Sequence, residues 1–150
     1  MSGIYFNAKY RIKRNAAYEE HMRFMRDDIK LFSDYASMLM VSAIIGFNNH
    51  TYVPNFKPAS DGVQTQFFSP KSIDIIDLIA YSHENKQSIL SSDEKYKIFE
   101  GYANGGFPIL IDKLGIDFTD PIKNDRLVLF EKYFGLLLTN GFLINDGTNN

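Results

Sequence analysis

One segment of the chain is apolar on nearly every side, and it limits the folds that the chain can adopt. Over residues 29–45, apolar side chains recur at steps of three and four, which predicts a helix, and Gly46 stands where a left-handed cap would end it. Toward its C-terminal end, Met38, Val41 and Ile45 extend the apolar surface to the remaining sides. A helix that is apolar all round is buried, so other elements must surround this one.

Helix start signals predict the elements that surround it. Ser69-Pro70 and Asp120-Pro121 each place a capping side chain before a proline at the first helical position, and Asn15 and Ser92 are further caps. With Pro108 opening a short segment, the predicted helices cover residues 16–26, 29–45, 70–81, 92–103, 108–114 and 121–140. In the last of them the expected buried stripe consists of Leu127, Phe130, Phe134, Leu137 and Leu138.

The string Asn104-Gly105-Gly106 ends the fourth of these patterns. A glycine at positive φ there closes a helix without steric cost, so the string predicts a sharp turn after a buried aromatic helix. Asp74 and Asp77, in the helix that follows Pro70, are expected on a solvent-facing polar stripe.

The remaining segments have other patterns. Residues 47–69 are rich in turn residues and predict a long irregular loop, or a short β-hairpin that joins 51–53 to 63–67. Residues 1–14 alternate apolar and polar side chains and predict a basic N-terminal arm or strand, residues 15–144 a helical domain, and 145–150 a flexible tail. The fold class is therefore mainly α, a single compact domain of about six helices.

Composition limits the setting in which the protein works. A chain of 150 residues with 45% hydrophobic residues is long enough for one core, and with no cysteine it forms neither disulfides nor thiolate metal sites. No apolar run approaches the ~20 residues that span a bilayer, and the first residues lack a signal-peptide pattern. We therefore expect a cytoplasmic protein with no membrane contact.

Positive charge gathers near the N-terminus although the net charge is −2. Residues 1–30 carry seven Lys or Arg against four acids, which suggests a nucleic-acid surface as one interpretation and a solvated charged face as the simpler one. Under the first interpretation the phosphate-binding residues are Lys9, Arg11, Lys13, Arg14, Arg23 and Arg26.

Catalytic motifs are weak. The three histidines lack ligand spacing for zinc, and no nucleotide-binding glycine loop occurs, so no cofactor is expected. Asp77 with Glu84-Asn85-Lys86 resembles the minimal pattern of a metal-dependent nuclease. That chemistry needs both acids to converge on Mg²⁺, whereas here one lies in a helical pattern and the other in a polar connection, so a nuclease is the remote alternative.

Three blocks of sequence within roughly residues 30–114 carry a resemblance by their order and spacing. The blocks are Met40-Val41-Ser42-Ala43-Ile44-Ile45-Gly46-Phe47-Asn48-Asn49-His50-Thr51-Tyr52-Val53-Pro54, then Ile75-Ile76-Asp77-Leu78-Ile79-Ala80, then Ile98-Phe99-Glu100-Gly101-Tyr102-Ala103-Asn104-Gly105-Gly106-Phe107. Through them the chain resembles a small bacterial family, the DNA phosphorothioation-associated (Dnd-system-associated) accessory proteins of the short type. Gly101 departs from the pattern, because a better helix former is expected there and glycine costs the helix about 1 kcal/mol.

The resemblance implies an accessory role in bacterial defence against foreign DNA and transfers no catalytic residue. We therefore predict a non-enzymatic protein that docks onto a larger defence-system protein, with a DNA-binding accessory subunit as the alternative. The residues expected to bind the partner are Tyr102, Asn104, Phe107, Tyr52 and Phe56.

Overall fold

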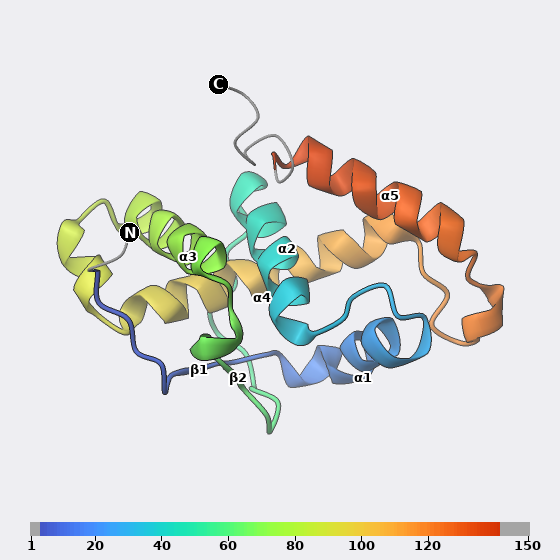
Figure 1. Ribbon diagram of the computed structural model, residues 1–150, viewed down its shortest axis with the longest axis horizontal. Coiled ribbons are helices and arrows are strands. Elements are labelled where there is room, and N and C mark those ends of the chain that lie inside the picture. The colour runs from blue at the N-terminus through green and yellow to red at the C-terminus, as the bar shows by residue number, and fades with distance from the viewer. Residues whose placement is uncertain (1–3, 142–150) are drawn as a thin grey trace.

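A single long helix, α4 (Glu94–Leu114), runs through the middle of the molecule (Figure 1). The computed structural model describes residues 4–141, which hold five α-helices, short 3₁₀ and π-helical turns and a two-stranded sheet. α2 (Tyr35–Asn48) crosses α4 along the most extensive contact in the molecule, and α3 (Pro70–Glu84) packs beside the first half of α4. The predicted mainly α class is confirmed.

Two glycines set the distance between α2 and α4. A Cβ on Gly46 would lie 2.1 Å from the carbonyl oxygen of Tyr102, and one on Gly106 would lie 1.8 Å from that of Ser42. The two backbones therefore approach closer than any residue with a side chain permits. Gly46 is thus an interior residue of α2 and not its cap, which corrects the expected helix end.

The predicted helix end at Asn104-Gly105-Gly106 is wrong, because α4 continues through it to Leu114. In the described residues the glycines with positive φ are Gly115 and Gly141. Pro108 lies inside the helix and removes one backbone donor, so the two helices expected at 92–103 and 108–114 are one. Gly115, with φ of 62°, ends the helix as expected.

The start of α2 also differs from the prediction. Lys30 has φ of 54°, which breaks a helix, and the Asp34 carboxylate accepts the backbone N–H of Ser37 at 2.7 Å. The helix therefore begins at Tyr35 and not at residue 29. Ile29 and Phe32 are buried all the same, in the connection that precedes the helix.

Other helix starts agree with the sequence. The Ser69 hydroxyl caps α3 by accepting from Ser72 N, and the helix runs to Glu84, past its predicted end. The Asn15 side chain caps a 3₁₀ turn that leads into α1 (Glu19–Arg23), and a π-helical segment (Phe24–Asp28) continues it.

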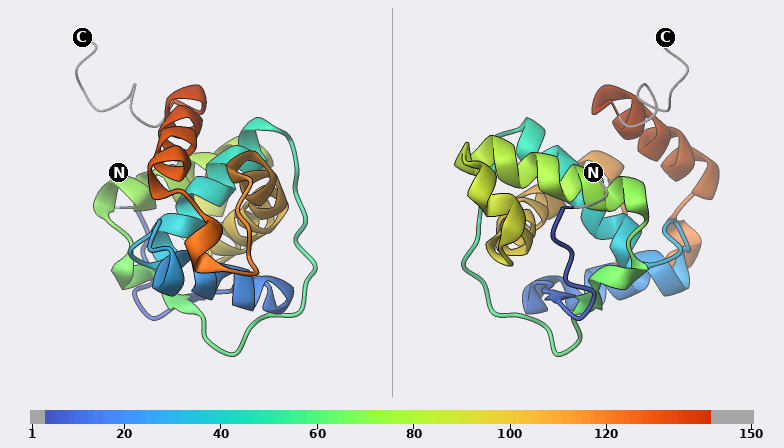
Figure 2. Two further views of the ribbon diagram at one scale, coloured as in Figure 1. Left: turned by 90° about the vertical axis from the view of Figure 1, so that its right-hand side faces the viewer. Right: turned by 60° about the vertical axis from the view of Figure 1, so that its left-hand side comes forward.

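The small sheet pairs segments that the sequence does not associate. β1 (Arg11–Ile12) runs antiparallel to β2 (Val63–Gln64), with Arg11 opposite Gln64. The hairpin considered for residues 51–53 and 63–67 is therefore not formed. Residues 49–62 are an extended connection, which the two further views in Figure 2 follow along the outside of the molecule.

The last helix, α5 (Arg126–Thr139), begins after a cap at Asp125, so the start predicted at residue 121 is wrong. Asp120 caps a separate 3₁₀ turn (Pro121–Lys123) that precedes the helix. α5 lies above one end of α4 and shares little contact with it. None of the helices in the described range combines the length and the apolar character that crossing a bilayer requires. The predicted flexible tail, 145–150, lies outside the described residues.

Candidate functional site

Three of the five residues predicted to bind a partner face inward. Tyr102, Asn104 and Phe107 belong to α4, where their exposed fractions are 9%, 8% and 0%. Tyr52 and Phe56 lie partly buried in the connection between α2 and β2. Phe107 cannot reach a partner unless α4 moves, so Tyr52 and Phe56 are the members of the set that offer contact area.

Asn104 joins three segments of the chain. Its Oδ1 accepts from Asn15 Nδ2 at 2.8 Å, and its own Nδ2 donates to the carbonyl oxygen of Val53 at 2.9 Å. One side chain thereby attaches both the N-terminal segment and the 49–62 connection to α4. The asparagine of the Asn-Gly-Gly string acts as an internal link.

Tyr102 belongs to an aromatic group that reaches the surface through His83. The Tyr102 hydroxyl and His83 Nδ1 are joined by a hydrogen bond of 2.8 Å, and the Tyr52 ring lies 4.5 Å from the His83 ring. Burial raises the pKa of both tyrosines, so each keeps its proton at neutral pH. Gly101 lies beneath Tyr52, with the ring 2.3 Å from where a Cβ would be, so close packing explains the glycine that weakens the helix.

Polar side chains of α4 hold the N-terminal segment, residues 4–14, which we call the docked arm. The Glu100 carboxylate accepts Lys13 N–H at 2.8 Å and the Tyr10 hydroxyl at 3.2 Å, and Tyr96 accepts Asn7 N–H at 2.9 Å. Burial raises the pKa of Glu100, and these two donors oppose the rise only in part. The predicted basic arm is therefore ordered along α4 and includes strand β1.

The six cations predicted to bind nucleic acid divide into two groups of three. Arg14 is 2% exposed and donates to Glu19 at 2.6 Å and to the Asp61 carbonyl at 2.9 Å. Arg23 pairs with Glu19 and Arg26 with Asp27. The other three, Lys9, Arg11 and Lys13, are exposed on the docked arm.

Those three exposed cations line one open groove of about 530 Å³, which we call the basic groove. Its opposite side comes from residues 58–60 and Gly62, just before β2. Every charged side chain that lines it is a cation. The complete lining is Asn7, Lys9, Tyr10, Arg11, Lys13, Pro58, Ala59, Ser60 and Gly62.

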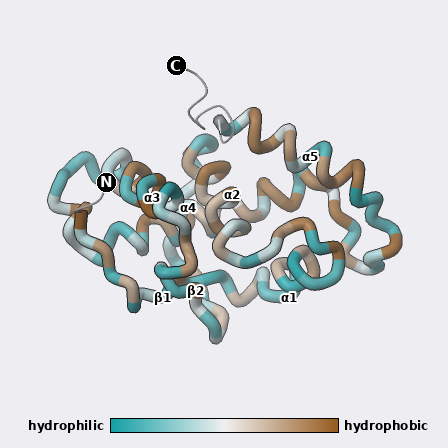
Figure 3. Tube along the Cα trace, viewed as in Figure 1, coloured by the Kyte–Doolittle hydropathy of each residue, from teal (hydrophilic) through white to brown (hydrophobic). Residues whose placement is uncertain are grey.

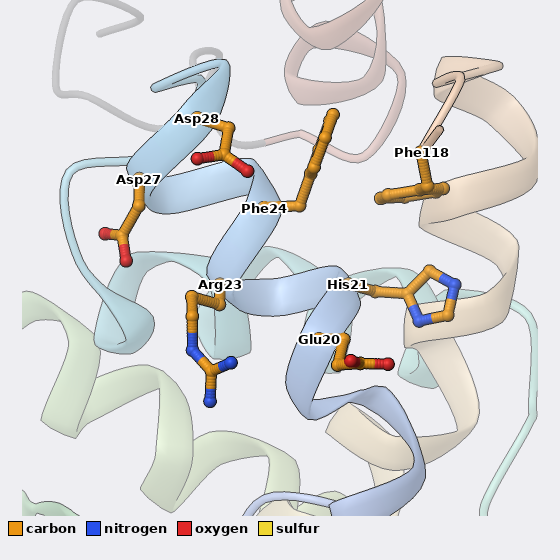
Figure 4. A pocket seen from close by; sticks show the side chains of 7 residues that line it. All are labelled: Glu20, His21, Arg23, Phe24, Asp27, Asp28 and Phe118. Carbon is orange, nitrogen blue, oxygen red and sulfur yellow. The ribbon is translucent and has the colours of Figure 1, made fainter. Parts of the chain in front are cut away.

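A second hollow, of about 390 Å³, lies between α1 with its π-helical extension and the segment after α4 (Figure 4). The Phe118 ring is 4.5 Å from the His21 ring and 5.4 Å from the Phe24 ring, and the Nδ1 atom of His21 is buried without a hydrogen-bond partner. The acids around it are Glu20, Asp27 and Asp28. Among residues 4–141 no three histidine or carboxylate side chains converge to hold a metal, so this hollow is an aromatic surface with an acidic rim.

The acids considered for a nuclease do not converge. Asp77 is 1% exposed, and its Oδ1 lies 3.0 Å from Nζ of Lys95, which is fully buried. Its place on a solvent-facing stripe is thus corrected, because α3 turns it toward α4. Glu84 is exposed at the far end of α3, about two helical turns away.

The most exposed row of large apolar side chains lies on α5, where the sequence predicts burial. Leu127, Phe134, Leu138 and Phe130 are 72%, 58%, 52% and 41% exposed, so four of the five residues in the expected buried stripe face solvent. Leu129 is the fully buried residue of this helix. We call these four the α5 face, and Figure 3 shows how apolar the helix is along its length.

The sequence spacing correctly places the four side chains on one side of a helix, but only the tertiary structure shows that this side faces solvent. Steps of three, four and four place the four side chains on one side of the helix. The other side, through Leu129 and the partly buried Tyr133, rests on the core, where Tyr133 packs against Phe32 at 4.9 Å. A helix apolar on both sides gives no indication of which side is covered.

Comparison with known protein families gives a match over most of the chain. A family model described as DNA sulphur modification system-associated protein 4 matches residues 11–134. No curated protein and no solved structure is significantly similar to the chain.

Proposed function

Because the chain belongs to the DNA sulphur modification system-associated protein 4 family, we propose that it is a non-enzymatic accessory protein of such a system. It acts in the bacterial cytoplasm, in defence against foreign DNA, by docking onto a larger protein of the same system. The observation that carries this proposal is the α5 face.

An exposed stripe of large apolar side chains is costly in water, and soluble monomers rarely keep one without use. Anchors at steps of three and four along a helix are the pattern by which an amphipathic helix enters an apolar groove of another protein. Leu127, Phe130, Phe134 and Leu138 follow this pattern over nearly the whole of α5. Family membership supports a component of the sulphur modification system, one that offers such a groove, as the occupant.

The position of α5 suits this role. The helix keeps its own place through Leu129 and Tyr133, so its exposed side is presented without unfolding. Ile122, in the turn before the helix, is 91% exposed, so a further large apolar side chain near the helix start faces solvent. Pre-ordered contact surface lowers the entropy lost on binding.

Co-purification of the chain with each co-expressed protein of its sulphur modification system tests the proposal. We expect one of them to be retained by the wild type and lost with the double variant Phe134→Glu/Leu138→Glu. The matched control is Leu78→Glu/Tyr81→Glu on α3, where the two side chains are 56% and 40% exposed, and it should bind as the wild type does.

Thermal unfolding of both variants verifies that they remain folded. Equal retention of the partner by both double variants contradicts the proposed surface. A wild-type chain that forms a stable dimer through α5, abolished by Phe134→Glu/Leu138→Glu, contradicts the proposed occupant.

A further inference from the structure

The basic groove is a concentration of unpaired positive charge on a chain whose net charge is −2. Among the described residues, no carboxylate lies within ion-pair distance of the side chains of Lys9, Arg11 or Lys13. The other members of the N-terminal cluster differ in this respect, because Arg14, Arg23 and Arg26 are each paired with an acid. Because acids pair with these three arginines only, the three cations without an acidic partner lie together in one groove.

The fold also fixes the direction in which Arg11 and Lys13 point. Along β1 and its continuation, Ile12 and Arg14 are buried while Arg11 and Lys13 are exposed, which is the alternation of an extended strand. Pairing of Ile12 with Val63 and the bond from Lys13 N to Glu100 hold the backbone in that register. The cations are therefore presented from an ordered support.

The uncharged lining of the groove suits an anionic chain. The Tyr10 ring is part of the lining, with Lys13 Nζ 5.4 Å from its centroid, and Ser60 adds a hydroxyl on the opposite side. Contacts of Lys, Arg and Ser side chains with phosphate oxygens are the commonest in DNA complexes, and they fix position without reading sequence. The β1–β2 pair beside the groove has two residues in each strand, which is too short for a ribbon that reads bases in the major groove, so we infer contact with the DNA backbone.

We propose that the basic groove binds the phosphodiester backbone of duplex DNA, independently of base sequence, through Lys9, Arg11 and Lys13. The groove lies on elements other than α5, so this activity and partner docking are separable. Arg14 acts in the support of the groove, and Arg23 and Arg26 have no part in it.

Fluorescence anisotropy with a labelled 20-base-pair duplex, titrated at several salt concentrations, tests the proposal. Each phosphate contact contributes about 0.9 to the slope of log K against log salt. The triple variant Lys9→Gln/Arg11→Gln/Lys13→Gln should lose up to about 2.7 of that slope, with a matching fall in affinity at low salt.

The control removes the same number of charges from exposed lysines elsewhere, as Lys86→Gln/Lys113→Gln/Lys123→Gln. It should keep the wild-type slope, and thermal unfolding should show both triple variants folded. An equal loss in the control, or no binding by the wild type at low salt, overturns the proposal.

Two further probes identify the anion. Tighter binding to a duplex RNA of the same length overturns the assignment to DNA, and equal affinity for polyglutamate indicates an acidic protein as the ligand, which also overturns it. The variant Phe134→Glu/Leu138→Glu should bind the duplex as the wild type does, so a failure of docking and a failure of DNA binding remain distinct.

Discussion

At the scale of single residues, glycines determine how closely the helices approach. Gly46 and Gly106 let the backbones of α2 and α4 touch, and Gly101 makes room for Tyr52. Each glycine lowers the intrinsic helix stability by about 1 kcal/mol, and the close packing that it permits offsets this loss. The sequence reveals the low helix propensity of glycine but not the close contact between helices, which is why the Asn-Gly-Gly string predicts a helix end.

The variant Gly106→Ala should lower the free energy of unfolding by about 1–3 kcal/mol, because its Cβ would meet a backbone oxygen that cannot move independently. Gly135→Ala is the matched control. It lies in α5 with no atom within 4 Å of the new Cβ, and should raise stability by up to about 1 kcal/mol. Urea unfolding monitored by circular dichroism measures both, and a neutral Gly106→Ala would contradict the close helix crossing.

At the scale of elements, the sequence predicts capping side chains better than the bounds or the orientation of helices. Ser69 and Asp120 form caps as expected, because capping depends on neighbours a few residues away, although Asp120 caps a 3₁₀ turn and α5 begins only at Arg126. Pairing of β1 with β2, and the turn of Asp77 toward Lys95, depend on residues distant in sequence. The same holds for the candidate site. The sequence shows the cations, but it does not show which of them pair with an acid and which do not.

Hydrogen exchange should distinguish α5 from the other long helices. Its amides are expected to exchange faster than those of α2 and α4, because Leu129 is its one fully buried side chain while the crossing helices are buried along most of their lengths. Mass spectrometry of peptic fragments resolves these segments. Addition of the docking partner should slow exchange in α5, whereas protection equal to that of α2 in the free chain would show that the α5 face is already covered.

At the scale of the whole molecule, buried carboxyls link the docked arm and α3 to α4. Burial raises the pKa of Asp77 and of Glu100 above the unfolded values of 3.8 and 4.5. Both groups bind protons more tightly in the folded state. Their contribution to stability is therefore fully present below those pH values and is lost as the pH rises through the raised pKa values.

The variant Glu100→Gln isolates this effect, because the amide oxygen still accepts from Lys13 N–H but does not titrate. The wild type should be more stable relative to this variant at pH 4 than at pH 7. Chemical denaturation at a series of pH values gives the difference in the free energy of unfolding. A difference that grows as the pH rises would contradict the raised pKa.

The docked arm has a consequence for synthesis of the chain. Its hydrogen-bond partners Asp93, Tyr96 and Glu100 follow it by 86–90 residues. At elongation rates of about 5–20 residues per second, the arm leaves the ribosome some 5 to 20 seconds before α4 exists to receive it. The docked arm is thus made before the helix that receives it, and its basic residues remain without these partners throughout that interval.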